Sequence, residues 1–323
     1  MNNSHTVEAH IKAFAKRENC IIGICDTAPL TLDTTRFTPF VSSNLAKRTD
    51  PAASLPGVKS IIVVGVESKI EAFPPMPEGA GILSVLGVAE DYHVVVKSLL
   101  KKLVDELRAQ VNFMYKILVD SPTLDERALA VRAGLGFIGR NGLVISPEYG
   151  SRFNIGVLLT DIAIASEAKQ STILGLLPPR YARGRLCNAP CNDGGGGCSA
   201  NQRSQAVTCP PNCRNCITAC PTGALTRSNG LDAARCISYL TQKDNLTKEE
   251  AVLVGCHLYG CDICQNVCPL NRPAPTAWAS PYDWLSMSDE DFAKVYGHTA
   301  MLWRGPVLLR RNAANLINNP YTL

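Results

Sequence analysis

The sequence predicts a mixed α/β or α+β fold, in which a sheet-and-helix domain is followed by a small cysteine-rich domain and a short helical segment. Two observations support this prediction. Short apolar runs alternate with amphipathic helical patterns over residues 1–162, as in sheets that are covered by helices. Twelve of the fourteen cysteines then fall between Cys187 and Cys268. We expect domains at 1–162 and 209–275, an irregular connection at 163–208 and a helical segment at 276–323.

Apolar runs bounded by turn-forming residues predict the strands of the first domain. The run KSIIVVGV is uninterrupted and β-branched, as expected for a strand covered on both faces. Helices are predicted where apolar residues recur every three or four positions. The strands are expected at Ile21–Cys25, Lys59–Val66, Tyr115–Val119, Leu143–Ile145 and Ile155–Leu159, and the helices at Thr6–Glu18, Asp91–Arg108 and Leu124–Ala133. This order predicts a mixed sheet with helices packed on it.

Proline, glycine and polar residues are frequent from Ala163 to Pro211, where we place the junction between the domains. After Pro269, helical patterns return at Ser288–Tyr296 and Pro306–Ile317. The last of these resembles one helix of an incomplete helical hairpin.

The composition is that of a soluble globular protein, with 46% hydrophobic and 19% charged residues. The longest apolar runs are far shorter than the ~20 residues that span a bilayer, and the first ten residues are polar, unlike a signal peptide. We therefore expect a cytoplasmic protein without membrane contact, in which dense cysteines favour metal binding over disulfides. A net charge of +4 permits a polyanionic partner without indicating one.

Two cysteine runs end in Cys-Pro, which is the pattern of proteins that hold two [4Fe–4S] clusters. The runs are Cys209-x3-Cys213-x2-Cys216-x3-Cys220-Pro and Cys261-x2-Cys264-x3-Cys268-Pro. Each cluster requires four thiolates, and the last cysteine of such a run binds the other cluster. This rule predicts two sets of ligands, Cys209, Cys213, Cys216 and Cys268 for one cluster, and Cys220, Cys236, Cys261 and Cys264 for the other.

Other assignments of the cysteines stay open. Cys209 is the least regular ligand, because three residues separate it from the next cysteine where bacterial ferredoxins have two. Pairs of the form C-x2-C also build zinc sites, although the C-x3-C-P endings have no purpose in a zinc ribbon. Cys187, Cys191 and Cys198 form a looser group that could hold a third metal, and Cys256 could be a spare thiol or a substitute ligand.

The segment Val119–Asn141 is the candidate for a reacting site, because two clusters alone only carry electrons. Asp120 follows a predicted strand, where a short acid can project into a pocket or simply cap the turn. The next helix opens with Asp-Glu-Arg, and acids in a first turn often only complement the helix dipole. Gly134, Gly136 and Gly139 allow close approach of a large ligand, but they follow a helix and so do not form a dinucleotide fingerprint.

Several separate stretches carry a family resemblance. They are DYH at 91–93, DSPTLDERALAVRAGLGFIGRNGLVISPEYGSRFNIGVLLTD from Asp120, CPTGA from Cys220, RCISYLT from Arg235 and YGCDICQNVCPLN from Tyr259. Together they resemble the epoxyqueuosine reductases, which are cobalamin-dependent iron–sulfur enzymes of tRNA modification related in architecture to the reductive dehalogenases. The resemblance covers most of residues 5–320.

The resemblance implies that the first domain binds a corrinoid, so that it would be the corrinoid-binding domain. The clusters would pass single electrons to this cobalamin, and epoxyqueuosine in tRNA would be reduced to queuosine. Asp120 matches the family's proton donor, a role that requires burial to raise its pKa toward neutrality. His93 is a further pocket candidate, unless it is an ordinary core or surface histidine. The residues that match the corrinoid-contacting backbone are Gly134, Gly136, Gly139, Arg140, Asn141 and Ser151.

The implied partners are tRNA and a reductant protein such as a flavodoxin or ferredoxin. The basic residues that could contact phosphates are Lys47, Arg48, Arg180, Arg183, Arg185, Arg310 and Arg311. The chain departs from the family pattern at Pro122, in the long segment 163–208 and in a helical region cut short near Leu323. These departures leave open that the chain is a paralogue that acts on another substrate. A ferredoxin-type electron carrier and a corrinoid reductase for a small molecule are the alternative functions.

Overall fold

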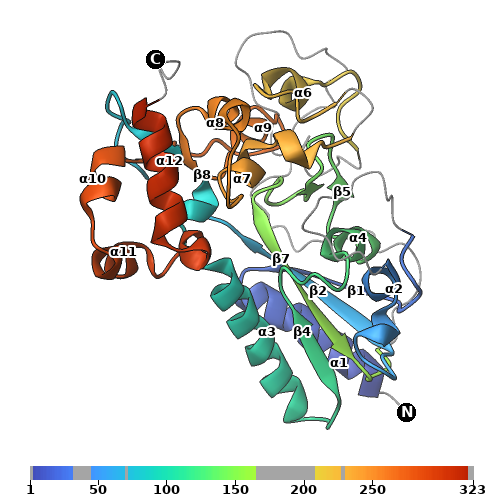
Figure 1. The fold of residues 1–323 in the computed structure, drawn as a ribbon. Coiled ribbons are helices and arrows are strands. Elements are labelled where there is room, and N and C mark those ends of the chain that lie inside the picture. The colour runs from blue at the N-terminus through green and yellow to red at the C-terminus, as the bar shows by residue number, and fades with distance from the viewer. Residues whose placement is uncertain (1–2, 32–44, 70–71, 165–207, 227–229, 319–323) are drawn as a thin grey trace.

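The computed structural model describes residues 3–31, 45–69, 72–164, 208–226 and 230–318 (Figure 1). Its larger sheet has the strand order β1-β2-β7-β4. The strands are β1 (Ile21–Cys25), β2 (Ser60–Glu67), β4 (Tyr115–Leu118) and β7 (Phe153–Thr160). All of its pairings are antiparallel. The predicted mixture of strand directions is therefore wrong for this sheet, because an uninterrupted apolar strand indicates that both faces are covered and does not fix strand direction.

Helices cover both faces of this sheet (Figure 1). Ile62 and Val64 of β2 are buried with α1 (Asn3–Arg17) and α3 (Tyr92–Arg108), whereas Ile61 and Val63 are buried with α4 (Glu126–Arg132) on the other face. The short helix α2 (Leu45–Thr49) and the 3-10 turn η2 (Pro51–Ala53) precede β2. Neighbouring side chains of one strand thus belong to two different cores, as the period of two in a strand requires.

Side-chain caps mark where the predicted helices α3 and α4 begin. The Asp91 side chain accepts a hydrogen bond from the His93 backbone N–H and caps α3, and the Asp125 side chain caps α4. Gly134 follows α4 with φ of 80°, which ends the helix. The chain then forms a hairpin of β5 (Phe137–Ile138) and β6 (Val144–Ile145), of which the sequence predicted only the second strand.

A smaller sheet joins distant parts of the chain. It has the order β8-β3-β9 and consists of β3 (Gly81–Leu83), β8 (His257–Tyr259) and β9 (Ala277–Ala279). β3 runs parallel to β8 and antiparallel to β9. Around it pack the helices of the predicted C-terminal segment, which are α10 (Pro281–Ser286), α11 (Asp289–Tyr296) and α12 (Pro306–Asn318). A strand from the first 162 residues therefore lies in the same hydrophobic core as residues 277–316.

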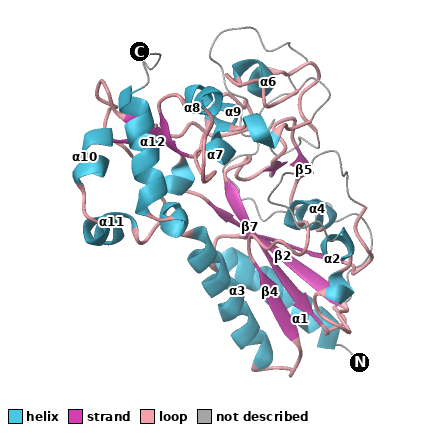
Figure 2. Cartoon of the chain, viewed as in Figure 1, coloured by secondary structure: helices cyan, strands magenta, loops and turns pink. Residues whose placement is uncertain are grey.

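Short helices separated by loops form the cysteine-rich part (Figure 2). They are α6 (Asn215–Ala219), α7 (Ile237–Leu240), α8 (Lys248–Val254) and α9 (Ile263–Asn266), with the 3-10 turns η3 (Val85–Gly87), η5 (Ala233–Arg235) and η6 (Ala300–Arg304) nearby in the fold. The predicted connection at 163–208 lies almost wholly outside the described residues. Among the helices that are described, none has the length and apolar character needed to cross a membrane.

Candidate active site and cluster-binding loops

The structure gathers the first predicted set of cysteines around one cavity. Cys209, Cys213, Cys216 and Cys268 all line it. Helices α6 and α9 pack against each other, which brings the end of the second run back to the first. Burial raises the pKa of the Cys268 thiol to about 11, and the nearby thiols of the other three act in the same direction. The four sulfurs therefore lie close to one another.

The second predicted set is also gathered. Burial raises the pKa of the Cys261 thiol to about 12, and the nearby Cys236 and Cys220 thiols raise it further. The pKa of Cys264 is raised by burial and by Cys261 and Cys236. The structure thus brings together the same two sets that the spacing predicted, while iron ligation by each cysteine stays a prediction.

The first set, Cys209, Cys213, Cys216 and Cys268, fits a [4Fe–4S] cluster. A single metal ion needs ligands that converge on one point. In the described part of the chain, no group of three or more His, Cys, Asp or Glu side chains is arranged to hold such an ion. A [4Fe–4S] cluster is larger and takes one thiolate on each of its four irons. Four partly buried cysteines spread around a cavity match that requirement.

Arg140 and Asn141 contact the loop of the first cysteine run. The Arg140 backbone N–H donates to Cys209 Sγ at 3.4 Å, and its guanidinium donates to the backbone oxygens of Pro210, at 3.2 Å, and Cys213. Asn141 is 5% exposed and lines the cavity with the cysteines. Both residues were predicted to contact a corrinoid, and the structure places both against the cluster-binding loop.

Ser151 contacts the second run. Its backbone N–H and hydroxyl donate to Asn271 Oδ1, at 2.7 and 3.3 Å, and the hydroxyl also lies 3.0 Å from Gln265 Oε1. The buried Arg152 beside it donates to Asn266. At Gly150 a Cβ would lie 2.1 Å from Asn271 Oδ1, so this contact requires glycine. The chain before β7 therefore holds the second cluster-binding loop in place.

The predicted corrinoid-contacting glycines have packing roles in this structure. Gly134 ends α4, and at Gly136 a Cβ would lie 2.1 Å from the Ile145 backbone oxygen. At Gly139 it would lie 2.5 Å from Ile145 Cδ1. At Gly142, by contrast, a Cβ would meet nothing within 4 Å. Unlike Gly136 and Gly139, Gly142 is therefore not needed for close packing, and the sequence analysis did not single it out.

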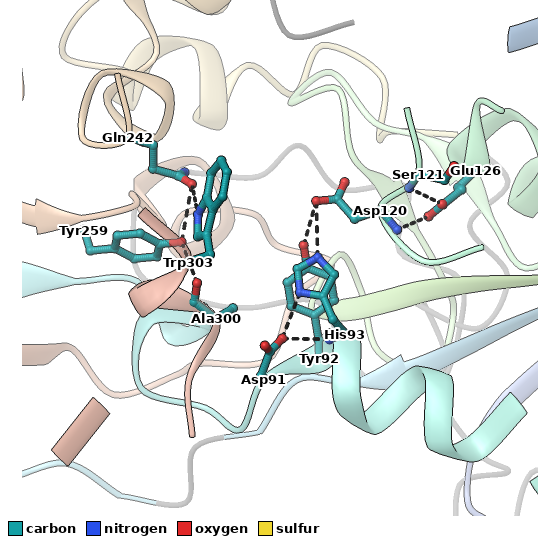
Figure 3. Close-up of polar contacts among 10 residues, drawn as sticks. All are labelled: Asp91, Tyr92, His93, Asp120, Ser121, Glu126, Gln242, Tyr259, Ala300 and Trp303. Atoms are coloured by element: carbon teal, nitrogen blue, oxygen red, sulfur yellow. Dashed lines mark hydrogen bonds and ion pairs between the residues drawn. The ribbon is translucent and has the colours of Figure 1, made fainter. Parts of the chain in front are cut away.

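Asp120 lies at the centre of a polar cluster at the N-terminus of α3 (Figure 3). Tyr92 Oη donates to Asp120 Oδ2 at 2.9 Å, and His93 Nε2 lies 3.6 Å from the same oxygen. The His93 Nδ1 atom lies 2.8 Å from Asp91 Oδ1, which orients the ring. The Asp120 side chain is 70% exposed, so the burial that the proton-donor role requires is not met by the protein alone.

Glu126 holds the backbone of this site. Asp120 has a φ of 50°, a sparsely populated region for a residue with a side chain. The Glu126 carboxylate accepts hydrogen bonds from the backbone N–H groups of Asp120 and Ser121, at 3.0 and 2.7 Å. Burial raises the pKa of Glu126 to about 7, against the effect of these two bonds. From its place in the first turn of a helix, Glu126 was predicted to be at most a dipole partner, and it was missed as a site residue.

The Asp120 site faces the C-terminal part of the molecule (Figure 3). Asp120 is near enough to Tyr259 of β8 to act on its pKa, which burial raises to about 12. Tyr259 Oη and Trp303 Nε1 both donate to Gln242 Oε1, at 3.3 and 3.0 Å. Trp303 is 61% exposed. Residues far apart in the sequence thus lie around an exposed acid, which short motifs do not predict.

Among the seven basic residues proposed for phosphate contact, Arg48, Arg310 and Arg311 have partners within the protein. Arg48 is buried and donates to the Pro122 backbone oxygen. Arg310 forms an ion pair with Asp289 at 2.6 Å, and Arg311 donates to the backbone of the loop before α8. Arg180, Arg183 and Arg185 lie outside the described residues, as do Cys187, Cys191 and Cys198.

Comparison with known proteins shows the family. The chain is 32% identical over 291 residues to the epoxyqueuosine reductase of Staphylococcus aureus strain NCTC 8325, a match that covers 85% of this chain and 67% of that protein. This chain belongs to the epoxyqueuosine reductase family. The family model "Epoxyqueuosine reductase QueG, DUF1730" matches residues 48–121 of this epoxyqueuosine reductase homologue. A second model, the 4Fe-4S double cluster binding domain, matches residues 209–271 and confirms the prediction of a two-cluster domain.

Solved structures of the epoxyqueuosine reductase family have the same fold as this chain. One, with a tRNA-Tyr epoxyqueuosine-modified stem loop, matches with a TM-score of 0.78 and 27% identity, over 98% of this chain and 82% of that chain. The Bacillus subtilis enzyme, solved with an aspartate-containing catalytic loop swung out of the active site, matches with a TM-score of 0.75, 27% identity and the same coverage. The mixed α+β fold predicted from the sequence is confirmed by this likeness.

Proposed function

We propose that this chain reduces epoxyqueuosine in tRNA to queuosine, using two [4Fe–4S] clusters and cobalamin. The observation that carries the proposal is the exposed Asp120 carboxylate, which Tyr92 and His93 hold in a chain that belongs to this family. An exposed acid at the end of a strand can reach a substrate that is too large to enter the protein.

The proposed reaction converts an epoxide into an alkene. It consumes two electrons and two protons, breaks both C–O bonds of the epoxide, forms the C=C bond and releases the oxygen as water. Electrons enter singly through the two clusters. Cobalamin, when bound, would supply the reduced cobalt chemistry that delivers them to the substrate. The protein's part is to orient the substrate, to exclude water and to supply a proton.

The fit of a corrinoid rests on two features near the N-terminus of α4 that have open space beside them. One is the turn at Gly142, where a Cβ would meet nothing within 4 Å. The other is Asp120, with 70% of its side chain exposed. Arg127 Nη1 donates to the Gly142 backbone oxygen, and the adjacent Glu126 binds the Asp120 backbone, so one helical turn supports both features. We infer that they border the corrinoid.

Asp120 is the residue that we propose donates the proton to the epoxide oxygen. Tyr92 and His93 hold its carboxyl oxygen, and Asp91 orients His93. A carboxylic acid near water loses its proton too easily at neutral pH. Bound substrate and corrinoid would cover the exposed carboxyl and exclude water from it. The catalytic aspartate loop of the Bacillus subtilis enzyme supports this role.

The test is single-turnover reduction of an epoxyqueuosine-modified tRNA stem loop. The chain is reconstituted anaerobically with iron, sulfide and cobalamin, desalted, reduced and mixed with the RNA. We expect about eight irons and one cobalt per chain, following four irons per cluster, and formation of queuosine. A chain with eight irons that binds no cobalt is an electron carrier instead. A chain with both cofactors that leaves the RNA unchanged acts on another substrate.

A further inference from the structure

We propose that the side-chain amide of Asn141 donates a hydrogen bond to the cluster held by Cys209, Cys213, Cys216 and Cys268, and that this bond raises the reduction potential of that cluster. We call this cluster the first cluster. The inference depends on the two-cluster domain and not on the tRNA substrate, so it can fail or succeed independently of the proposed function.

The amide of Asn141 has an unused donor. Its Oδ1 accepts a hydrogen bond from the Leu143 backbone N–H at 3.2 Å, which fixes the orientation of the amide because only the oxygen can accept. The Nδ2 atom is buried and has no hydrogen-bond partner among the described residues. A buried donor left without an acceptor costs about 1–3 kcal/mol. Such a group in a native protein points to a bound acceptor.

The surroundings of this amide show what the acceptor is. Asn141 lines the cavity that the four cysteines of the first cluster share, and it is 5% exposed. The preceding residue already donates to this set of sulfurs, since the Arg140 backbone N–H lies 3.4 Å from Cys209 Sγ. The sulfide and thiolate sulfurs of the first cluster are therefore the acceptors available to the amide of Asn141. Two adjacent residues would donate to the same cluster.

The hairpin keeps this stretch in position. The Gly139 N–H donates to the Leu143 backbone oxygen at 2.8 Å, and the Gly142 N–H donates to the Gly139 backbone oxygen at 2.9 Å. At Gly139 a Cβ would lie 2.8 Å from Asn141 Oδ1, so glycine is needed to seat the amide. The donor is preorganised, and little conformational entropy is lost when it binds the cluster.

The effect on potential follows from charge. One-electron reduction makes the cluster and its four thiolates more negative, and a hydrogen-bond donor stabilises the more negative state. Hydrogen bonds to cluster sulfurs are among the factors that set iron–sulfur potentials. The Asn141 amide would therefore make the first cluster easier to reduce. The second cluster, bound by the other cysteines, would not feel this bond directly.

The experiment is a redox titration of both clusters in the reconstituted protein, followed by electron paramagnetic resonance without substrate. We expect Asn141→Leu, which has nearly the same shape and no donor, to lower the reduced-to-oxidised ratio of one cluster about tenfold at a fixed applied potential. Tenfold corresponds to 59 mV for one electron, and to the lower end of the strength of hydrogen bonds with charged groups. The midpoint of the other cluster should not move.

Two further variants separate donation from structure. Asn141→Asp keeps the shape and the oxygen that accepts from Leu143, but at a pH where the carboxyl is ionised it has no donor. We expect its potential to fall further than that of Asn141→Leu, because the ionised carboxyl adds a negative charge beside the cluster as well as removing the donor. If Asn141→Leu loses iron, Asn141→Asp serves as the donor-free protein in the nitrogen-coupling measurement below. The matched control is Asn215→Ala, because Asn215 lines the same cavity but its amide donates to the Val267 backbone oxygen at 3.4 Å.

A second readout tests for the bond itself. In protein labelled with 15N-asparagine, pulsed electron paramagnetic resonance of the reduced first cluster should detect a weakly coupled nitrogen that is missing in Asn141→Leu. Identical couplings in the two proteins, or unchanged potentials in both Asn141 variants, would overturn the proposal.

Discussion

The cluster-binding loops and the Asp120 site differ in how the chain builds them. The cysteines of the loops are partly buried, and the hairpin at Arg140–Asn141 and the backbone at Gly150–Ser151 hold these loops from outside. The Asp120 site draws on α3, the turn after β4 and α4, and its acid is 70% exposed with a backbone φ of 50°. One region is closed before any substrate arrives, and the other is open.

The difference corresponds to the two tasks. A cluster that stores electrons works best in fixed, dry surroundings, because its potential depends on hydrogen bonds and solvent. An acid that serves a tRNA base must admit a large partner and become buried only when that partner is bound. We therefore expect variants of the loops to act on cofactor content, and variants of the Asp120 site to act on turnover while the clusters stay intact.

The largest effect is expected for Cys264→Ala. Cys264 is placed among the second set of cysteines, and its removal leaves one iron of that cluster without its thiolate, which destabilises the cluster. Iron content should fall from about eight to about four per chain, and turnover should be lost. Iron and sulfide analysis after anaerobic reconstitution measures this. The matched control is Cys25→Ala, a buried cysteine in the core of the larger sheet, which should keep all eight irons. Full iron content in Cys264→Ala would remove this residue from the ligand set.

Asp120→Asn should separate chemistry from cofactor binding. Asparagine keeps the shape of the side chain but has no carboxyl proton to donate, and general acids contribute about 10²–10⁴-fold to rate. We expect a loss of turnover of that size with iron and cobalt contents unchanged. Single-turnover assays with the modified stem loop measure it. Turnover within a factor of two of the unmodified protein would show that Asp120 only caps the turn after β4.

The contrast also explains what could be predicted from the sequence. Cluster ligation depends mainly on spacing within a tight loop, which is a local property, so ligands such as Cys209 could be proposed before the structure. Cys236, which lies outside both runs, was added as the isolated cysteine that completes the second set of four. Amphipathic and uninterrupted apolar patterns located α3 and β2 for the same reason. Strand β3 was missed, because three residues show no periodicity and its partners lie far away in the sequence.

The features that could not be predicted from the sequence depend on contacts between distant segments. Glu126 looked like a dipole partner because its sequence neighbours are helical, yet its partners are the strained backbone N–H groups of Asp120 and Ser121. Gly136 looked available to a ligand, but the hairpin closes over it with Ile145. Only the tertiary structure decides whether such residues are packed inside the protein or open to a ligand.

Glu126→Gln should loosen the Asp120 site without affecting the clusters. Glutamine has one acceptor oxygen for the two backbone N–H groups that the carboxylate now accepts. We expect turnover to fall about tenfold, as for the loss of one hydrogen bond to a charged group. Hydrogen exchange at the amides of Asp120 and Ser121 should become faster, and a variant with unchanged exchange would contradict the positioning role.

The pH dependence of the same residue gives a second measurement. The pKa of Glu126 is about 7 in the folded protein, whereas its ordinary value is 4.5. Between these two pH values the folded state therefore keeps a proton that the unfolded state has lost. The stability contribution is therefore fully present below pH 4.5 and is lost as pH rises through 7, by about 3 kcal/mol. An infrared titration should show a carboxyl band that disappears near pH 7 and is missing in Glu126→Gln.

The smallest effect is expected for Tyr92→Phe. The change removes the hydrogen bond from Tyr92 Oη to Asp120 Oδ2, while His93, 3.6 Å from the same oxygen, still holds the carboxyl. A net contribution of about 1 kcal/mol corresponds to about a fivefold loss of turnover. Single-turnover rates measure it, with Tyr282→Phe, an exposed tyrosine on α10, as the control that should not change. A loss as large as that in Asp120→Asn would mean that Tyr92 takes part in proton transfer, and that the open site depends on two proton-bearing groups rather than one.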